Sequence, residues 1–280
     1  HIVEAKEENG TVLPWRGLSC SSGAMPFIRN KLPTFEAFGR ASLNDVYSSP
    51  ALEDATVRRA TTLETTLFVN NSEPGKPRFD AIPLPRLAQI SPSFGANLFD
   101  ADGDTLTDCF LAQNFHAPQL EVGRMDSGLS MVLKGTGTSL EPVWPRGSGI
   151  AIRGDAMGSA VTDYNRDGSP DLLVAVNNGI LQAYDNTTKK HLAVSLKGLP
   201  GNIHGTGARV TLTFAEPSAP TLTSEVHTGS SYLSQSSPTI FFGRASFTPK
   251  SIMVRWPDAA RSKHPIPAGA TSVRIPQPAG

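Results

Sequence analysis

The stretch that decides the fold is Asp163-Tyr164-Asn165-Arg166-Asp167-Gly168-Ser169-Pro170-Asp171, followed directly by the apolar run Leu172-Leu173-Val174-Ala175-Val176. Its turn carries an oxygen-bearing side chain at every second position. Hard cations such as Ca²⁺ take roughly six to eight oxygen ligands, and such a turn can wrap around one ion. The apolar run is typical of a strand that is buried on both faces. The stretch therefore predicts a metal-binding turn that leads into a β-strand.

A second copy of this pattern lies 63 positions earlier, where Asp100 aligns with Asp163 and Asp108 aligns with Asp171. Self-similarity at a fixed period indicates a repeat architecture. A period of about 60 residues with about four strands per unit is typical of a β-propeller blade. Later strands of the two units are expected at residues 131–133 and 179–184. A weaker third trace covers residues 67–79 and resembles the second half of a blade.

The number of units is too small for a closed propeller. Closed propellers have about four to eight blades, whereas residues 1–190 have room for only about three. We therefore predict a mainly β chain with a partial β-propeller over residues 1–190 and a small helical insertion near residues 34–60. Helices are expected at 34–47 and 51–60. An open arc leaves blade faces and an edge unburied, so we expect a partner chain, self-association or a longer parent chain to complete it.

The predicted metal ligands are the oxygen-bearing positions of the two turns, with a backbone carbonyl at the seventh position. They are Asp100, Asp102, Asp104, Leu106 and Asp108 in the first turn, and Asp163, Asn165, Asp167, Ser169 and Asp171 in the second. A left-handed backbone is expected at the sixth position, which suits Gly168 better than the β-branched Thr105. An EF-hand is excluded because its twelfth position needs Glu, and Leu111 and Val174 stand there. The alternative is a pair of Asx-turns that connect strands without a metal.

The two turns resemble FG-GAP/VCBS repeats, the units of integrin-α-like β-propellers. Residues 163–175 match the pattern D-x-[DN]-x-D-G-x-x-D-[LF]-x-[VL]-A, and residues 100–112 match it with Thr105 in place of Gly. The resemblance implies structural Ca²⁺ bound at the blade edge and a secreted or cell-surface setting. It carries no catalytic residues.

Residues 191–280 form the second predicted domain, a small β-sandwich-like unit with strand-like alternation at 192–196 and 252–256. This region resembles the ASPIC/UnbV domain. The matching motifs are Gly205-x-Gly207-Ala208-x-Val210, Gly229-x-x-Tyr232-Leu233-Ser234-Gln235-Ser236, Phe242-Gly243 and Trp256-Pro257-Asp258. The sequence departs from the family pattern at Arg244, where the family usually continues with Leu-Gly, and at Ala259, where Gly usually follows Trp-Pro-Asp. Bacterial FG-GAP proteins with this C-terminal domain share the layout.

Composition narrows the function. The 25 basic and 25 acidic residues balance, so no positive excess favours nucleic acid as a partner. No apolar run approaches the roughly 18 residues of a membrane-spanning helix. Motif searches find no nucleophile elbow, no zinc-protease helix and no phosphate-binding loop, so no enzyme is indicated. We expect a non-enzymatic, extracellular Ca²⁺-binding adhesion, scaffolding or assembly protein. The alternatives are a glycan-binding, lectin-like propeller and a propeller enzyme that acts on sugars.

Two details stay open. The two cysteines, Cys20 and Cys109, are either two buried thiols or one disulfide, which requires Cα atoms within about 7 Å of each other. The chain begins at His1 rather than at Met, which suggests processing or a longer parent chain.

Overall fold

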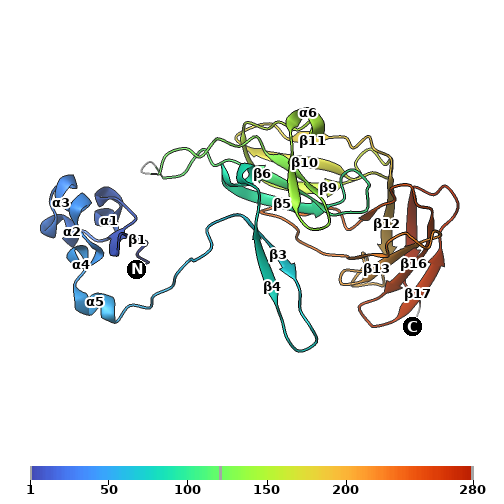
Figure 1. The fold of residues 1–280 in the computed structure, drawn as a ribbon, viewed down its shortest axis with the longest axis horizontal. Helices are drawn as coiled ribbons and strands as arrows, with labels where there is room; N and C mark the ends of the chain where they lie inside the picture. The colour runs from blue at the N-terminus through green and yellow to red at the C-terminus, as the bar shows by residue number, and fades with distance from the viewer. Residues whose placement is uncertain (1, 120–121, 279–280) are drawn as a thin grey trace. The chain divides into compact units, whose positions relative to one another are not determined.

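The computed structural model describes residues 2–119 and 122–278. Its chain divides into two compact units (Figure 1). The first comprises the residues up to 63 with a short stretch at 118–123, and the second comprises residues 64–117 and the chain from 124 onward. The structure is mainly β, with several small sheets and a short N-terminal helical region.

The first unit joins a hairpin to a group of short helices. The hairpin pairs β1 (Ala5–Glu8) with β2 (Thr11–Pro14). The helices are α1 (Leu18–Ala24), α2 (Phe27–Lys31), α3 (Phe35–Arg40), α4 (Leu43–Val46) and α5 (Ser49–Glu53). Their apolar side chains, among them Leu18, Ile28 and Phe38, form a core of their own.

The helices are shorter than the sequence predicts. The expected helix over 34–47 is split in two, because the backbone becomes extended at Ala41 and Ser42 starts α4 with a capping box to Asp45. The N-cap expected at Thr34 is confirmed, since its side chain accepts the N–H of Ala37 at 3.1 Å. The helix expected over 51–60 is wrong beyond Glu53. The residues from 56 to 60 are all exposed, and a short helix without a buried face is not stable.

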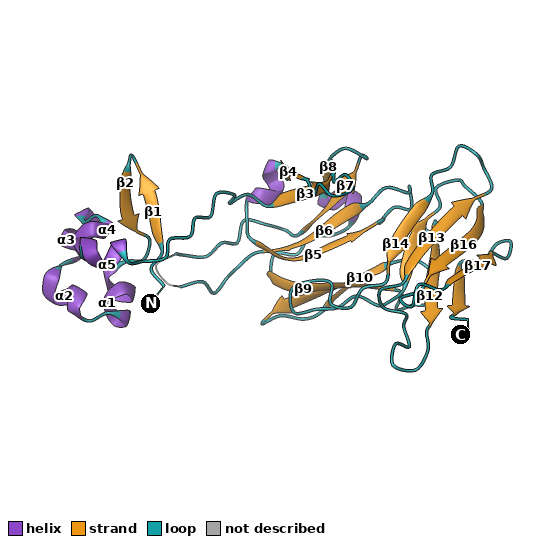
Figure 2. Cartoon of the chain, turned by 90° about the horizontal axis from the view of Figure 1, so that it is seen from below, coloured by secondary structure: helices purple, strands orange, loops and turns teal. Residues whose placement is uncertain are grey.

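Two successive sheets follow in the second unit, after the hairpin of β3 (Thr66–Asn70) and β4 (Phe79–Pro83) and the short 3₁₀ turn η1 (Arg86–Gln89). The two sheets are called the first and the second blade here, after the repeat units that the sequence predicts. The first is a four-stranded antiparallel sheet of β5 (Ser93–Phe99), β6 (Asp108–Gln113), β7 (Met131–Gly135) and β8 (Leu140–Val143). After the one-turn helix α6 (Pro145–Ser148), the second blade has three strands, β9 (Asp155–Thr162), β10 (Asp171–Asn177) and β11 (Gln182–Tyr184). Figure 2 shows the two blades side by side.

The 63-residue repeat is preserved in the pairing of the strands. Leu98 pairs with Cys109 in the first blade, and Val161 pairs with Leu172 at the equivalent place in the second. The facing sides of the blades share one apolar core that includes Phe110, Val161 and Val174. Four strands per unit holds for the first blade alone, and no ring of blades closes within the described ranges.

The C-terminal part of the second unit has two facing sheets. One has the order β15-β12-β18 and the other the order β14-β13-β16-β17. Their strands are β12 (His191–Lys197), β13 (Arg209–Phe214), β14 (Leu222–Glu225), β15 (Ile240–Gly243), β16 (Pro249–Arg255), β17 (Arg261–Pro265) and β18 (Ser272–Pro276). Between the sheets lies a core that contains Val194, Leu212 and Trp256. Two sheets around one core agree with the sandwich-like arrangement expected here, and the domain boundary at residue 191 remains a prediction.

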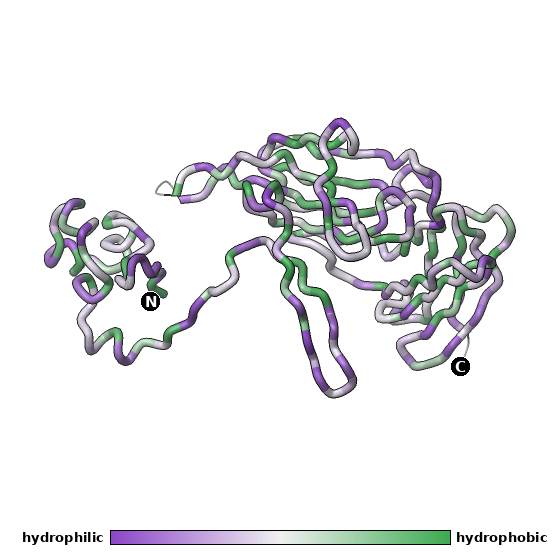
Figure 3. Tube along the Cα trace, in the orientation of Figure 1, coloured by the Kyte–Doolittle hydropathy of each residue, from purple (hydrophilic) through white to green (hydrophobic). Residues whose placement is uncertain are grey.

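Hydropathy follows this layering, with apolar residues concentrated in the strands of the blades and of the C-terminal sheets (Figure 3). The tip of the β3–β4 hairpin is hydrophilic. No helix in the described part of the chain is long and apolar enough to cross a membrane.

Both cysteines are free thiols, but the expectation that both are buried is wrong for Cys20. Cys20 is partly exposed on α1, whereas Cys109 on β6 is 4% exposed. Burial, and secondarily the charge of Asp108, raises the pKa of the Cys109 thiol to about 12.

The thiolate is the reactive form, so we expect one thiol per chain to react with Ellman's reagent at pH 8 and both to react in urea. The variant Cys20→Ser should lose the fast reaction. Two fast thiols, or none in urea, would contradict the structure.

Candidate metal centre

Two acidic loops join the first two strands of each blade: the first acidic loop (residues 100–108) and the second acidic loop (residues 163–171). In the first loop, the carboxylate of Asp100 accepts the backbone N–H groups of Gly103 and Thr105, both at 2.7 Å. In the second loop, Asp163 accepts the N–H of Gly168 at 3.0 Å. The carboxylate at the first position therefore closes both turns in the same way.

The ninth position repeats the same design. Asp108 accepts the N–H of Ala101 at 2.8 Å, and Asp171 accepts the N–H of Tyr164 at 3.1 Å. Each carboxylate also accepts a more distant backbone N–H: Asp108 accepts that of Gly135 at 2.7 Å, and Asp171 accepts that of Asn186 at 2.9 Å. These bonds tie the end of the loop to its beginning and to the neighbouring chain. The two loops are therefore equivalent in structure as well as in sequence.

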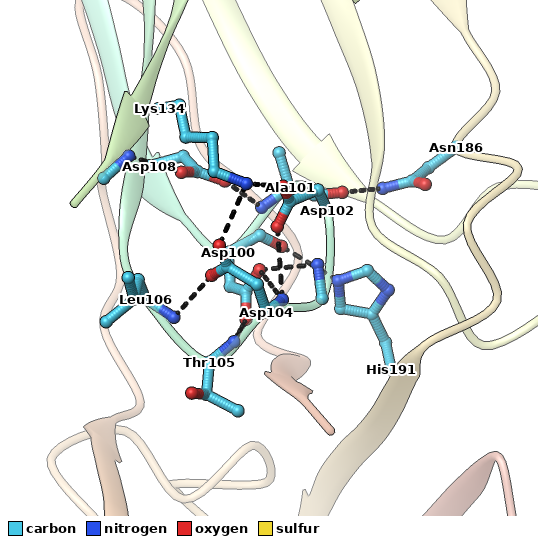
Figure 4. Close-up of polar contacts among 12 residues, drawn as sticks. Asp100, Ala101, Asp102, Asp104, Thr105, Leu106, Asp108, Lys134, Asn186 and His191 are labelled. Carbon is cyan, nitrogen blue, oxygen red and sulfur yellow. Dashed lines mark hydrogen bonds and ion pairs between the residues drawn. The ribbon is translucent and has the colours of Figure 1, made fainter. Parts of the chain in front are cut away.

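The first acidic loop gathers three carboxylates (Figure 4). One ligand oxygen each from Asp100, Asp102 and Asp108 lies within 4.8 Å of the other two. Burial raises the pKa of Asp100 to about 6, although its backbone hydrogen bonds act in the opposite direction. Burial also raises the pKa of Asp108. Because burial and mutual repulsion disfavour these charges, a bound cation would stabilise them, and the cluster can hold a metal ion.

Lys134 on β7 is a member of this site that sequence reasoning missed. Its ammonium group contacts Asp102 and lies 3.0 Å from the carboxylate of Asp104. These carboxylates raise the pKa of Lys134. No local sequence signal pointed to this contact, because it depends on the β6–β7 register that pairs Cys109 with Leu133 and so brings Lys134 beside Asp108. An ion in the loop would compete with this ammonium group for the same oxygens.

The second acidic loop is less complete. Its aspartates do not form a comparable cluster among the described residues. Asn165 and Asp167 form Asx-type bonds, with Asn165 accepting the N–H of Asp167 at 2.9 Å. Asp171 is fully buried, and burial raises its pKa. The hydroxyl of Ser169 is buried and has no hydrogen-bond partner among the described residues. Of the ten predicted ligands, the structure thus brings Asp100, Asp102 and Asp108 together, and the ligand roles of all ten remain predictions.

The first acidic loop is also attached to the C-terminal sheets. The Nε2–H of His191 donates to the carbonyl oxygen of Asp100 at 2.9 Å, and the N–H of Ala245 donates to that of Gly103 at 2.7 Å. Burial lowers the pKa of His191, so its ring is neutral at pH 7. A Cβ atom at Gly243 would lie 1.7 Å from an Asp100 carboxylate oxygen. Only glycine permits this close approach of strand and loop.

The comparison with family models identifies the last part of the chain. Residues 198–280 match the model described as ASPIC and UnbV. The C-terminal region is an ASPIC/UnbV domain. FG-GAP/VCBS repeats are not detected, and no curated protein matches the chain. In this ASPIC/UnbV domain, Ala259 has a φ of 68°, which explains why the family pattern has Gly there.

The sixth position of each loop offers a matched test of this geometry. Thr105 has a φ of 82° and Gly168 a φ of 90°, so the left-handed backbone expected from the sequence is confirmed in both loops. A β-branched residue in this region carries about 1–3 kcal/mol of strain. We expect Thr105→Gly to raise the free energy of unfolding by about 1 kcal/mol, and Gly168→Thr to lower it, as measured by urea denaturation.

The control is Thr107→Gly, since Thr107 is the same residue type in the same loop and has no positive φ. There the added flexibility of glycine should destabilise the protein. Equal destabilisation by Thr105→Gly and Thr107→Gly would show that Thr105 is not strained.

Proposed function

We propose that this chain is a non-enzymatic, extracellular scaffolding or adhesion module whose blades are stabilised by Ca²⁺. The observation that carries the proposal is the carboxylate cluster of Asp100, Asp102 and Asp108 in a loop whose hydrogen-bond pattern recurs at Asp163 and Asp171. Repetition of the same oxygen-rich turn in two blades is better explained by a structural role than by a catalytic one.

The ligand chemistry favours a hard cation. The site offers carboxylate oxygens. His191 is not among its ligands, because its Nε2–H donates to the carbonyl oxygen of Asp100 and its buried ring is neutral. Oxygen-only sites suit Ca²⁺ or Mg²⁺, and a loop that supplies many oxygens suits the larger ion. Lys134 partly neutralises the loop, and an ion would have to displace its ammonium group. This competition lowers the affinity of the loop for the ion. Weak sites of this kind are filled at the Ca²⁺ concentrations found outside cells, where modules bind at about 10⁻⁴–10⁻³ M.

An assembly role is supported by the second blade. Side chains alternate between the faces of a strand, and Leu172 and Val174 of β10 point into the core shared with the first blade. Leu173 and Ala175 therefore belong to the opposite face, where Leu173 is half-buried and Ala175 is exposed. This is the face on which a further blade, from a protein partner, a second copy or a longer parent chain, would pack.

Chelation tests the Ca²⁺ part of the proposal. An ion that binds only the folded state at a concentration 100 times its Kd stabilises that state by about 2.7 kcal/mol. For a unit of this size, we expect the Tm in 10 mM Ca²⁺ to exceed the Tm in EDTA by roughly 5–10 °C. Asp102→Ala should remove most of the Ca²⁺ stabilisation from the first loop, because it removes one of the three gathered carboxylates. The loop itself should stay folded, because Asp102 accepts only one N–H within it.

Asp54→Ala serves as the matched control, since Asp54 is exposed and lies outside both loops. It should leave the response to Ca²⁺ unchanged. A Tm that is equal in Ca²⁺ and EDTA, together with no heat of Ca²⁺ binding by calorimetry, would disprove the proposal.

A glycan-binding role is the second candidate, and one depression favours it. A cavity of about 260 Å³ beside the second acidic loop is lined by hydroxyl groups, including those of Ser195 and Thr239, and by the charged groups of Asp163 and Arg274. Such groups can bind sugar hydroxyls and an acidic substituent. We expect any glycan detected on an array to be acidic and to lose binding with Arg274→Ala. An array without hits would exclude this candidate.

A further inference from the structure

The segment of residues 229–237, here called the edge strap, leaves the ASPIC/UnbV domain and reaches the two blades. It lies between β14 and β15 in sequence, and in Figure 1 this orange stretch passes beside the blade strands. Its sequence, Gly-Ser-Ser-Tyr-Leu-Ser-Gln-Ser-Ser, contains five serines. The strap forms a tight turn in which Leu233 has a φ of 47° and is 87% exposed.

The edge strap binds β9 as a neighbouring strand would. The hydroxyl of Ser234 accepts the N–H of Ser159 at 3.3 Å and donates to the carbonyl oxygen of the same residue at 2.8 Å. At Val161, the N–H donates to the hydroxyl of Ser236 at 3.0 Å, and the carbonyl oxygen accepts the N–H of Ser237 at 2.9 Å. The outward N–H and C=O groups of two alternate β9 residues are thus all satisfied.

The strap also reaches the first blade. The hydroxyl of Ser231 accepts the N–H of Ala96 on β5 at 3.0 Å. The ring of Tyr232 lies against that of Phe94, with centroids 5.3 Å apart. One segment therefore bonds the first strand of both blades, next to the buried bond between Asn97 and Ser159 that joins them at 2.5 Å.

A glycine on β9 allows the backbone of the edge strap to approach this strand closely. Gly158 on β9 has no side chain, and a Cβ atom there would lie 3.2 Å from the carbonyl oxygen of Tyr232. β5 and β9 are both edge strands of their sheets. An open edge with unpaired N–H and C=O groups is a template for strand addition by another chain.

We propose that the edge strap is a built-in cover that clamps the two blades together and prevents a second copy of this chain from adding a strand at β9. The hydroxyls of Ser234 and Ser236, together with the backbone N–H of Ser237, replace the backbone groups of a neighbouring strand, so these edge groups of β9 are satisfied without a further strand. This function goes beyond the proposed Ca²⁺-stabilised scaffold and does not rest on it. The edge strap thereby directs assembly away from the edges of the blades at β5 and β9.

The test removes the hydroxyls. In the triple variant Ser231→Ala, Ser234→Ala and Ser236→Ala, hydrogen exchange of the amides of Ser159 and Val161, followed by NMR, should accelerate at least tenfold. Sedimentation velocity should then show association that increases with protein concentration. A second variant, Gly158→Val, should displace the strap without removing any hydroxyl and give the same two results. All samples contain 10 mM Ca²⁺, so that the outcome is separate from metal binding.

The matched control is Thr211→Ala with Thr223→Ala, which removes a hydroxyl pair at 3.1 Å within the ASPIC/UnbV domain. It should alter neither β9 exchange nor association. Unchanged protection of the Leu212 and Val254 amides checks that the variants fold. Unchanged exchange at Ser159 and Val161 in both strap variants would overturn the clamp. Faster exchange in a protein that stays monomeric at every concentration would overturn the protection against strand addition.

Discussion

The structure of the blades depends on the carboxylates that begin and end each acidic loop. Asp100 and Asp163 collect the backbone N–H groups of their turns, and Asp108 and Asp171 bind the loop back to its start. Without these bonds, a turn of nine residues between two strands would have several unsatisfied N–H groups and no single conformation. The resulting register places the apolar side chains of both blades in one core.

The same hydrogen bonds hold loop carboxylates in buried positions, where their negative charge is unfavourable. A carboxylate that must accept several N–H groups is drawn into the protein, and Asp108 is only 1% exposed. Burial then opposes its ionisation, and a neighbouring carboxylate opposes it further. The chain supplies one counter-charge, Lys134, to Asp102 and Asp104. A divalent cation would neutralise the three gathered carboxylates more completely, which is why metal binding and stability are linked in our proposal.

Several contacts join the blades to the C-terminal sheets. His191 holds the carbonyl oxygen of Asp100, Gly243 leaves space for the Asp100 carboxylate, and the edge strap binds β5 and β9. The first two act at the acidic loop and the third at the strand edges. If an ion orders the first loop, it therefore also orders the surface on which His191 packs. In our proposal, a further blade would pack on the face of the second blade that carries Leu173 and Ala175.

The sequence by itself determined the repeat, the loops and the β-rich character of the chain, because these depend on local patterns. Alternating oxygen side chains require a turn, and the apolar runs after Asp108 and Asp171 require buried strands. The left-handed backbone at Thr105 and Gly168 was predictable for the same reason. Tertiary structure alone decided the pairing of Lys134 with the first loop, the burial of His191, the breaks between the short helices and the course of the edge strap. These features join residues that are distant in sequence, such as Ser236 and Val161. No local pattern specifies such contacts, because they depend on how sheets pack and on which backbone groups remain unpaired.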